Sequence, residues 1–276
     1  LRSVLDAPQP LDAWSRAQWM PLAQQLGGAV FKSAVLDATL GESERVRAAE
    51  ILVELFGGID DATAVNGVRD KSPRVRARMA WALGRDARPD SPRLLAALAL
   101  DDAPVVRRCA IEALLAETID APTALSLLPA NLAHDDARVR LAAVQLAVRL
   151  PAATWQVLWE TRSRFGAPAQ LALAHAAILR APEKAVHVEA AEAVLSLFGQ
   201  AMASDLRLHA ARLMFRALGD YNLHKPSLEI YTEYEFPDAA AVRRAVSTTT
   251  ARWAMSGRVS GAAATFPCAA PSVRRR

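Results

Sequence analysis

The sequence has few of the features on which enzymes and disulfide-stabilised domains depend. Only two cysteines occur in its 276 residues, Cys109 and Cys268, so a disulfide framework is not expected. It contains no phosphate-binding loop, no G-x-G-x-x-G, no H-E-x-x-H and no C-x-x-C pattern. Glu183 and His187 are four residues apart, but two ligands without a third favour a solvated surface pair over a metal site. We therefore expect no catalytic residue, no metal and no cofactor.

Long apolar runs and a basic surface are also missing. No uninterrupted stretch of about 18 apolar residues occurs, so we expect no membrane span. The net charge of +4 comes from the end of the chain, because residues 239–276 hold seven arginines and no acidic residue. Subtracting those seven from +4 leaves about −3 for residues 1–238, which argues against nucleic acid as a partner. Because the first residue is Leu1 and no leader is evident, we expect a piece of a longer protein, of undetermined compartment.

What the sequence does contain is a repeat. A branched apolar residue followed by arginine opens each of several alanine-rich runs, and the first four such pairs are 29, 31 and 33 residues apart. The pairs are Val46-Arg47, Val75-Arg76, Val106-Arg107, Val139-Arg140 and Leu206-Arg207. A period in this range is typical of stacked helical hairpins. The sequence therefore predicts an all-α solenoid.

Each repeat has the same local pattern. An acidic turn precedes the run, where a carboxylate can cap backbone N–H groups, and Pro73 and Pro104 stand near the first helical turn. The residues four and seven positions after the branched residue share one face of an α-helix, and apart from Glu50 in the first repeat they are small or apolar. Alanine is frequent there, as at Ala110 and Ala143, and lets neighbouring helices approach closely. We expect this stripe to pack inside the stack.

The stretch from Asp101 to Leu114, Asp-Asp-Ala-Pro-Val-Val-Arg-Arg-Cys-Ala-Ile-Glu-Ala-Leu, resembles the HEAT repeat in its short bacterial form, also called PBS-lyase HEAT-like. The resemblance covers residues 41–220 in about six units, of which one is degenerate, with Gln170-Leu171 where Val-Arg is expected. It implies a right-handed α-α superhelix. In that family the turn aspartate and the helix arginine form a hydrogen-bonded ladder between repeats. The residues that would form this structural ladder here are Asp70, Asp101 and Asp135 with Arg76, Arg107 and Arg140.

The segments outside the repeats have other patterns. Residues 1–40 predict a helical cap, in which Trp14 and Trp19 either close the end of the stack or form an exposed partner-binding pair. The stretch from Leu228 to Phe236 alternates in polarity, so residues 221–238 predict an extended capping segment. An alternative is a strand that pairs with a following domain. Residues 239–276 predict a basic, disordered tail.

A solenoid of this kind implies a non-catalytic scaffold that docks a protein partner or a neighbouring domain of the same chain. Positions two, six and ten after the branched residue share a face separate from the packed stripe, and they vary between repeats. In the first repeat this register selects Leu52 and Phe56. The later residues of the row, which we expect to bind the partner, are Trp81, Arg85, Glu112, Gln145, Arg149, Arg212 and Arg216. A pair at Trp155 and Trp159 predicts either core packing or a second docking patch.

Two alternative functions follow from resemblance alone. The repeats are similar to those of phycobilin lyases, which attach a tetrapyrrole to a client protein. The run from Leu208 to Asp220 is similar to the HEAT region of planctomycete dehydrogenase–cytochrome proteins, which are exported and carry a c-type haem domain. The haem-attachment pattern C-x-x-C-H is missing from this sequence, so that part would lie outside it.

Overall fold

A computed structural model describes residues 1–6, 16–86 and 88–180, together with single positions and short stretches at 190, 192–194, 196–197, 210 and 213. The chain divides into two compact units, Leu1–Arg180 and Ala181–Arg276. In the second unit the described residues are helical, and Ala190, Val194 and Leu197 are buried. Their spacing of four and three is that of one helical face.

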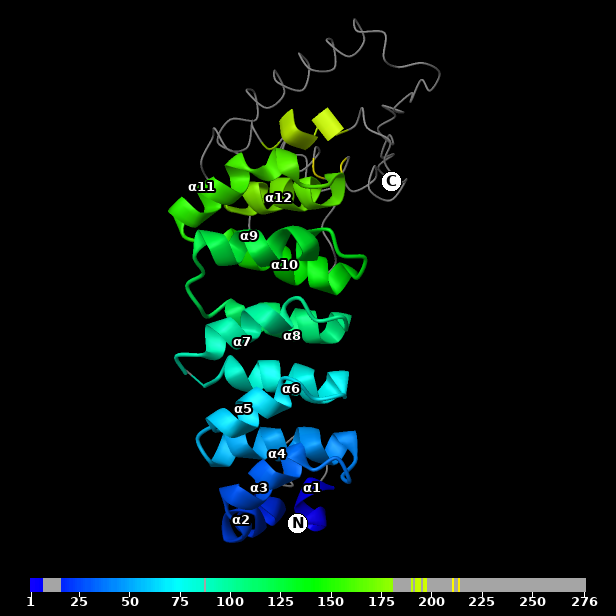
Figure 1. Ribbon diagram of the computed structural model, residues 1–276, viewed down its shortest axis with the longest axis vertical. Helices are drawn as coiled ribbons and strands as arrows, with labels where there is room; N and C mark the ends of the chain where they lie inside the picture. Colours follow the sequence, from blue (N-terminus) through cyan, green and yellow to red (C-terminus); the bar gives the residue numbers. More distant parts are fainter. Residues whose placement is uncertain are drawn as a thin grey trace, which may run out of the picture. The chain divides into compact units, whose positions relative to one another are not determined.

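Helical hairpins form successive layers of the first unit (Figure 1). The first helices of these hairpins are α3 (Gly28–Leu36), α5 (Asp61–Gly67), α7 (Ser91–Leu98), α9 (Ala121–Leu132) and α11 (Ala152–Glu160). The second helices are α4 (Glu42–Leu55), α6 (Pro73–Leu83), α8 (Pro104–Leu114), α10 (Ala137–Arg149) and α12 (Ala167–Arg180). The second helices pack on one another in order from α4 to α12. The described residues contain no strand, so the prediction of an all-α solenoid is confirmed.

Short elements complete the unit at its ends. Helices α1 (Arg2–Leu5) and α2 (Arg16–Leu26) precede the first hairpin, and a 3-10 turn, η1 (Arg162–Arg164), joins α11 to α12. Gly27 separates α2 from α3 with φ at 75°, in the left-handed region that glycine adopts without a Cβ penalty. Trp19 is buried, as expected of a residue that closes the stack, whereas Trp14 lies outside the described residues.

Polar side chains fix where the helices begin. Asp60 caps α5 by accepting a hydrogen bond from the Thr63 backbone N–H at 2.8 Å, and Asp120 caps α9 in the same way. Asp136 accepts from two backbone N–H groups at the start of α10. Pro73 and Pro104 each occupy the first position of a second helix, where a missing N–H costs nothing. Of the acidic turns expected to cap the second helices, that of Asp136 caps α10 directly, whereas Ser72 caps α6 and the N-cap of α8 is Ala103. The Asp70 and Asp101 carboxylates instead accept from Ser72 N–H and Ala103 N–H, just before those helices.

Small side chains form much of the core between layers. Ala80, Ala110 and Ala143 are each fully buried on the second helices, and Leu83 and Leu114 fill the space beside them. Alanine combines high helix propensity with a short side chain, so adjacent helices can pack closely. Met79, Ala110 and Ala143, which stand four positions after Val75, Val106 and Val139, are all fully buried, so this part of the expected stripe is inside the stack.

The register of the first repeat differs from the one that the Val46-Arg47 pair suggests. Arg45, not Arg47, makes the contacts that Arg76 makes one layer further on, so Glu44 stands in the place of Val75. Leu52 is consequently fully buried and does not belong to an outer face. The cause is local: Gly41 N–H donates to Glu44 Oε2 at 2.7 Å, which starts α4 without the Asp-x-x-Pro turn of the later repeats.

The boundaries at residues 40, 220 and 238 stay predictions. The extended segment 221–238 and the tail 239–276 lie outside the described residues.

Candidate functional site

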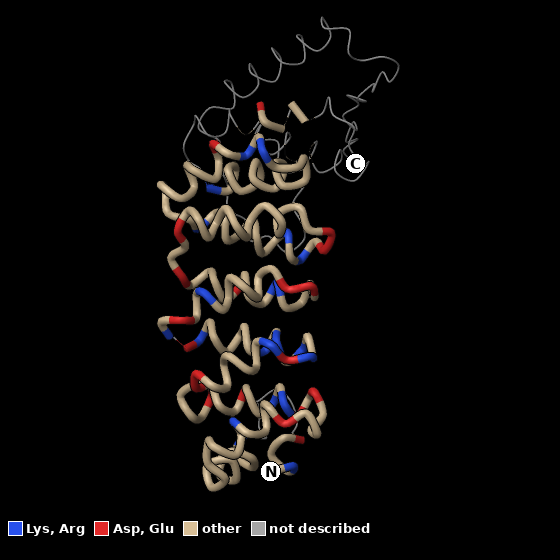
Figure 2. Tube along the Cα trace, in the orientation of Figure 1, with Lys and Arg blue, Asp and Glu red and all other residues tan. Residues whose placement is uncertain are grey.

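An arginine near the start of each second helix connects adjacent layers. Arg76 on α6 donates from Nε and Nη2 to the two carboxylate oxygens of Asp101, at 2.7 and 2.8 Å. Its Nη1 donates to the carbonyl of Asp70, six residues before it, at 2.7 Å. Arg45 makes the same forward contact to the Asp70 carboxylate. Acidic and basic residues of successive layers accordingly lie side by side along the edge where the second helices begin (Figure 2).

The forward contact changes at the next layer. Arg107 donates to the carbonyl of Asp101, six residues before it, but its forward partner is the amide oxygen of Asn131, at 3.4 Å. His134 stands six residues before Arg140, the position that Asp70 and Asp101 hold relative to Arg76 and Arg107.

His134 takes over the turn function of those aspartates. Its Nδ1 accepts from Asp136 N–H at 2.9 Å, as the Asp101 carboxylate accepts from Ala103 N–H. Asp135, which the resemblance places in the ladder, is exposed, and its carbonyl oxygen accepts from Arg140 Nη1 at 2.7 Å. His134 therefore occupies the position that Asp70 and Asp101 hold in the preceding layers, and it brings no negative charge there.

In the degenerate repeat Gln170 stands three residues after the first residue of α12, as Arg76 does in α6, so it occupies the arginine position and not the valine position that the Gln170-Leu171 pair predicted. Gln170 on α12 donates from Nε2 to the Phe165 carbonyl, five residues before it, at 2.6 Å. Arg140 makes the equivalent bond to Asp135. The shorter glutamine side chain thus supplies the bond within its own turn.

The residues expected to bind a partner lie on the outward side of α6, α8 and α10. We call Trp81, Arg85, Glu112, Gln145 and Arg149 the second-helix face. Trp81 is half-buried and the other four are exposed. Arg212 and Arg216, the last two residues of the predicted row, lie outside the described residues.

Two arginines hold the ring of Trp81. The guanidinium carbons of Arg78 and Arg85 lie over the indole, 4.8 and 4.6 Å from its centroid. Because these arginines are three residues before and four residues after Trp81, they lie one helical turn away from it on either side. Arg78 also pairs with Glu50 on α4, Nη2 to Oε1 at 3.0 Å. Trp81 is therefore a platform for positive charge and not a bare apolar anchor.

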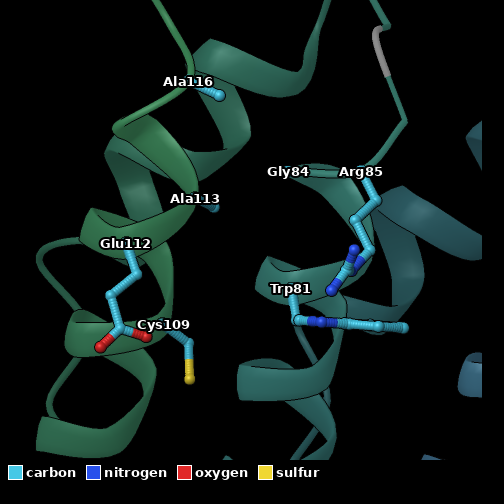
Figure 3. Close-up of a pocket in the computed structure, with 7 residues that line it drawn as sticks. All are labelled: Trp81, Gly84, Arg85, Cys109, Glu112, Ala113 and Ala116. Atoms are coloured by element: carbon cyan, nitrogen blue, oxygen red, sulfur yellow. The ribbon is translucent and has the colours of Figure 1, made fainter.

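An open cavity of about 250 Å³ lies between α6 and α8, beside this platform. Its larger lining residues are Trp81 and Arg85 on α6 and Cys109 and Glu112 on α8 (Figure 3). The rest of the lining is small: Gly84, Ala113 and Ala116. The ends of α6 and α8 approach closely here, since a Cβ on Gly84 would lie 2.6 Å from the Ala113 Cβ.

The charges around the cavity are of both signs. Glu112 is exposed and lies 3.5 Å from Arg108 Nε, so its carboxylate is partly balanced. Burial raises the pKa of the Cys109 thiol, which keeps that group protonated and weakly nucleophilic.

Arg149 extends the charged surface to the next layer. It is exposed, and its Nη1 donates to the Leu115 carbonyl at the end of α8, at 3.4 Å. Leu115 is adjacent to Ala116, which lines the cavity. The guanidinium of Arg149 thus reaches back toward the cavity from α10.

Sequence patterns did not reveal two contributors to this site. Glu50 is buried and sets the position of Arg78, but the Val46 register placed it on the packed stripe. When the first repeat is counted from Glu44, Glu50 stands at the same position as Trp81 and Glu112. That register would have predicted the place of Glu50 beside Arg78. Cys109 stands at the position of Arg78, one layer away.

The other candidates do not form sites in the first unit. Trp155 and Trp159 are buried with ring centroids 5.6 Å apart, and Arg180 and Arg162 cover them. In the part of the chain that the structure describes, no three metal-ligating side chains gather. Within the same residues, each helix is too short or too polar to cross a membrane. Glu183 and His187 lie outside the described residues.

Comparison with known families agrees with the hairpin stack. Residues 61–149 match HEAT repeats. The HEAT match begins at the first residue of α5 and ends at the last residue of α10, so it holds three complete hairpins and the whole second-helix face. A comparison with curated proteins gives no match.

Proposed function

We propose that the unit Leu1–Arg180 is a non-catalytic docking module that binds a protein partner, or a neighbouring domain of its own chain, through the second-helix face. HEAT repeats commonly serve as protein-interaction scaffolds, and the matched segment contains every described residue of this face. The family supports a binding role in general. The proposal that the partner binds at the second-helix face rests on the residues of that face.

The observation that carries the proposal is the separation of tasks within each second helix. The arginine at the start of the helix, such as Arg76, holds the layers together, and the alanine stripe packs the core. The residues at the fixed outward register differ from layer to layer: tryptophan, glutamate and glutamine at Trp81, Glu112 and Gln145. Structural positions repeat, whereas these positions vary. Variation at exposed positions on a constant scaffold is expected of a surface that recognises one partner.

The composition of the face favours a protein over nucleic acid. Tryptophan and arginine are the residue types most enriched at the energetic centres of protein interfaces. Glu112 lies among the arginines, and a nucleic-acid site would bring this carboxylate close to phosphate groups. Arg212 and Arg216 would extend the face by sequence register.

The test uses paired variants and capture from an extract of the source cells. The double variant Trp81→Ala and Arg149→Ala should capture less of the proteins that the parent chain captures. Quantitative mass spectrometry measures the amount of each captured protein. Arg93→Ala is the matched control, since Arg93 is an exposed arginine on a first helix, 3.8 Å from Asp90. The Arg93→Ala variant should capture the same proteins as the parent chain.

A second variant protects the test against loss of folding. Arg85→Glu combined with Arg149→Glu changes two exposed side chains and should leave the circular dichroism spectrum unchanged. The same captured set from parent, face variants and control would move the binding surface away from α6, α8 and α10.

A further inference from the structure

Three exposed charges of alternating sign surround one part of the second-helix face. Arg85 and Glu112 share the cavity between α6 and α8, and Arg149 reaches back to the end of α8. The order across the layers is therefore positive, negative, positive. A segment that crosses the helices in this direction meets these charges in turn.

The dimensions of the cavity decide which backbone fits. Gly84, Ala113 and Ala116 complete its lining, and none of them carries a side chain longer than a methyl group. An α-helix with its side chains is about 10–12 Å wide and would not enter a cavity of about 250 Å³. An extended chain is narrower than a helix, and it can place a single row of side chains along the lining of this cavity.

The spacing of the charges sets the sequence of that chain. Packed helices are about 8–10 Å apart, and Arg149 reaches back toward α8, so the two guanidinium groups stand roughly 10–15 Å apart. In an extended chain, every second side chain faces the same way, at about 3.3 Å per residue. Side chains i and i+4 are then about 13 Å apart, with i+2 between them.

We propose that the docked segment is an extended peptide with the pattern acidic-x-basic-x-acidic, its carboxylates on Arg85 and Arg149 and its cation on Glu112. The inference rests on the proposed docking function and names the partner's chemistry. Arg85 suits a carboxylate because its guanidinium lies over the Trp81 ring, and a guanidinium stacked on a ring keeps the N–H donors of its edge for a carboxylate. The weak bond from Arg149 to the Leu115 carbonyl uses one of its five N–H donors.

The experiment measures fluorescence anisotropy of labelled decapeptides with the full chain at low salt. The probes share one composition in the first two cases: a core of Asp-Ala-Lys-Ala-Asp, the shuffled core Asp-Asp-Lys-Ala-Ala, and the sign-reversed core Lys-Ala-Asp-Ala-Lys. The parent should bind the first core about tenfold more tightly than the shuffled one, the factor expected for one charge-assisted hydrogen bond. Added salt should weaken that binding.

The decisive variant reverses all three charges: Arg85→Glu, Glu112→Lys and Arg149→Glu. These side chains are exposed, so the fold is expected to persist, as circular dichroism checks. The variant should prefer the sign-reversed core. Equal binding of ordered and shuffled cores, an unchanged preference in the variant, or no binding of any core would each overturn the proposal.

Failure here is distinct from failure of the docking function. Proteins captured through the second-helix face that dock as a helix, or lack the acidic-x-basic-x-acidic pattern, would refute the peptide chemistry and leave docking in place. Capture that does not depend on the face would remove both.

Discussion

The Arg76 guanidinium is bound at once by two layers, through the carboxylate of Asp101 ahead of it and the backbone carbonyl of Asp70 behind it. Both members of the Arg76–Asp101 pair are mostly buried, with 16% and 12% of their side chains exposed. Planar guanidinium and carboxylate groups fix direction as well as distance. The pair therefore sets how α6 and α8 stack.

Removing this arginine should destabilise the first unit. Arg76→Ala leaves the Asp101 carboxylate without its main partner, and we expect a loss of about 1–3 kcal/mol in the free energy of unfolding. Urea denaturation followed by circular dichroism measures it. Arg74→Ala is the control, because Arg74 is 64% exposed and lies 3.8 Å from Glu42, and it should cost under about 0.5 kcal/mol. Equal costs for the two variants would contradict the role of the pair.

Restoring an aspartate at residue 134 should stabilise the unit. His134→Asp can keep the turn bond to Asp136 N–H and also offers Arg107 a carboxylate in the position of Asp101. We expect a gain of about 1 kcal/mol, the contribution of one added hydrogen bond between charged groups. His134→Asn separates the effects, since it keeps an acceptor for the turn and adds no charge. If both variants have the same urea midpoint, Arg107 does not use the new charge.

The close approach of α6 and α8 predicts a cost for one added methyl group. Gly84 has φ at −72°, which alanine also adopts, so conformation alone would favour Gly84→Ala. The new Cβ would nevertheless clash with Ala113, and we expect a loss of about 1–3 kcal/mol.

A second change tests that explanation. Combining Gly84→Ala with Ala113→Gly should cost less than the sum of the single changes in a double-mutant cycle of thermal melts. Gly166→Ala is the control, since its Cβ would meet Pro168 at an ordinary 3.8 Å. Additive costs would show that the contact is not the cause.

Acid should weaken the unit through its capping and ladder carboxylates. Hydrogen bonds from Thr63, helped by Lys32, lower the pKa of Asp60 to about 2 from its ordinary 3.8. Burial alone would raise the pKa of Asp101, but the Arg76 and Ala103 bonds outweigh it and the pKa is lowered. Since the folded pKa is depressed, the stabilisation is complete above about 4 and is lost as the pH falls toward 2.

Urea midpoints at a series of pH values between 5 and about 2 measure this loss. Asp60→Asn keeps a capping acceptor without a titrating charge, so its midpoint should fall less steeply over that range. A variant that follows the parent at every pH would exclude Asp60 from the acid response.

Periodicity was sufficient for the fold because the core positions repeat by residue type. Ala110 and Ala143 stand at the same place after Val106 and Val139, Met79 takes that place after Val75, and the stacked hairpins bury all three. The start of α4 was misjudged by two residues, since Val46-Arg47 has the right residue types in the wrong register. Only the three-dimensional structure shows that the Arg45 side chain reaches the Asp70 carboxylate.

The site was less predictable because its properties depend on several side chains at once. The outward position of Arg85, Glu112 and Arg149 follows from helical spacing. The covering of Trp81 by Arg78 and Arg85 depends on side-chain directions, and a count along the helix does not give them. His134 shows the same limit, since a one-residue difference in turn register decided between it and Asp135.

The change from aspartate to histidine at residue 134 has a consequence for cooperativity. In an array whose layers contact only their neighbours, the free energy of each interface decides separately whether folding extends from one layer to the next. Ionic bonds join α4 to α6 and α6 to α8, whereas Arg107 meets a neutral amide on α9 before α10. We expect local opening to divide the unit at this interface, so that backbone amides of α4, α6 and α8 exchange with solvent as one block and those of α10 and α12 as another.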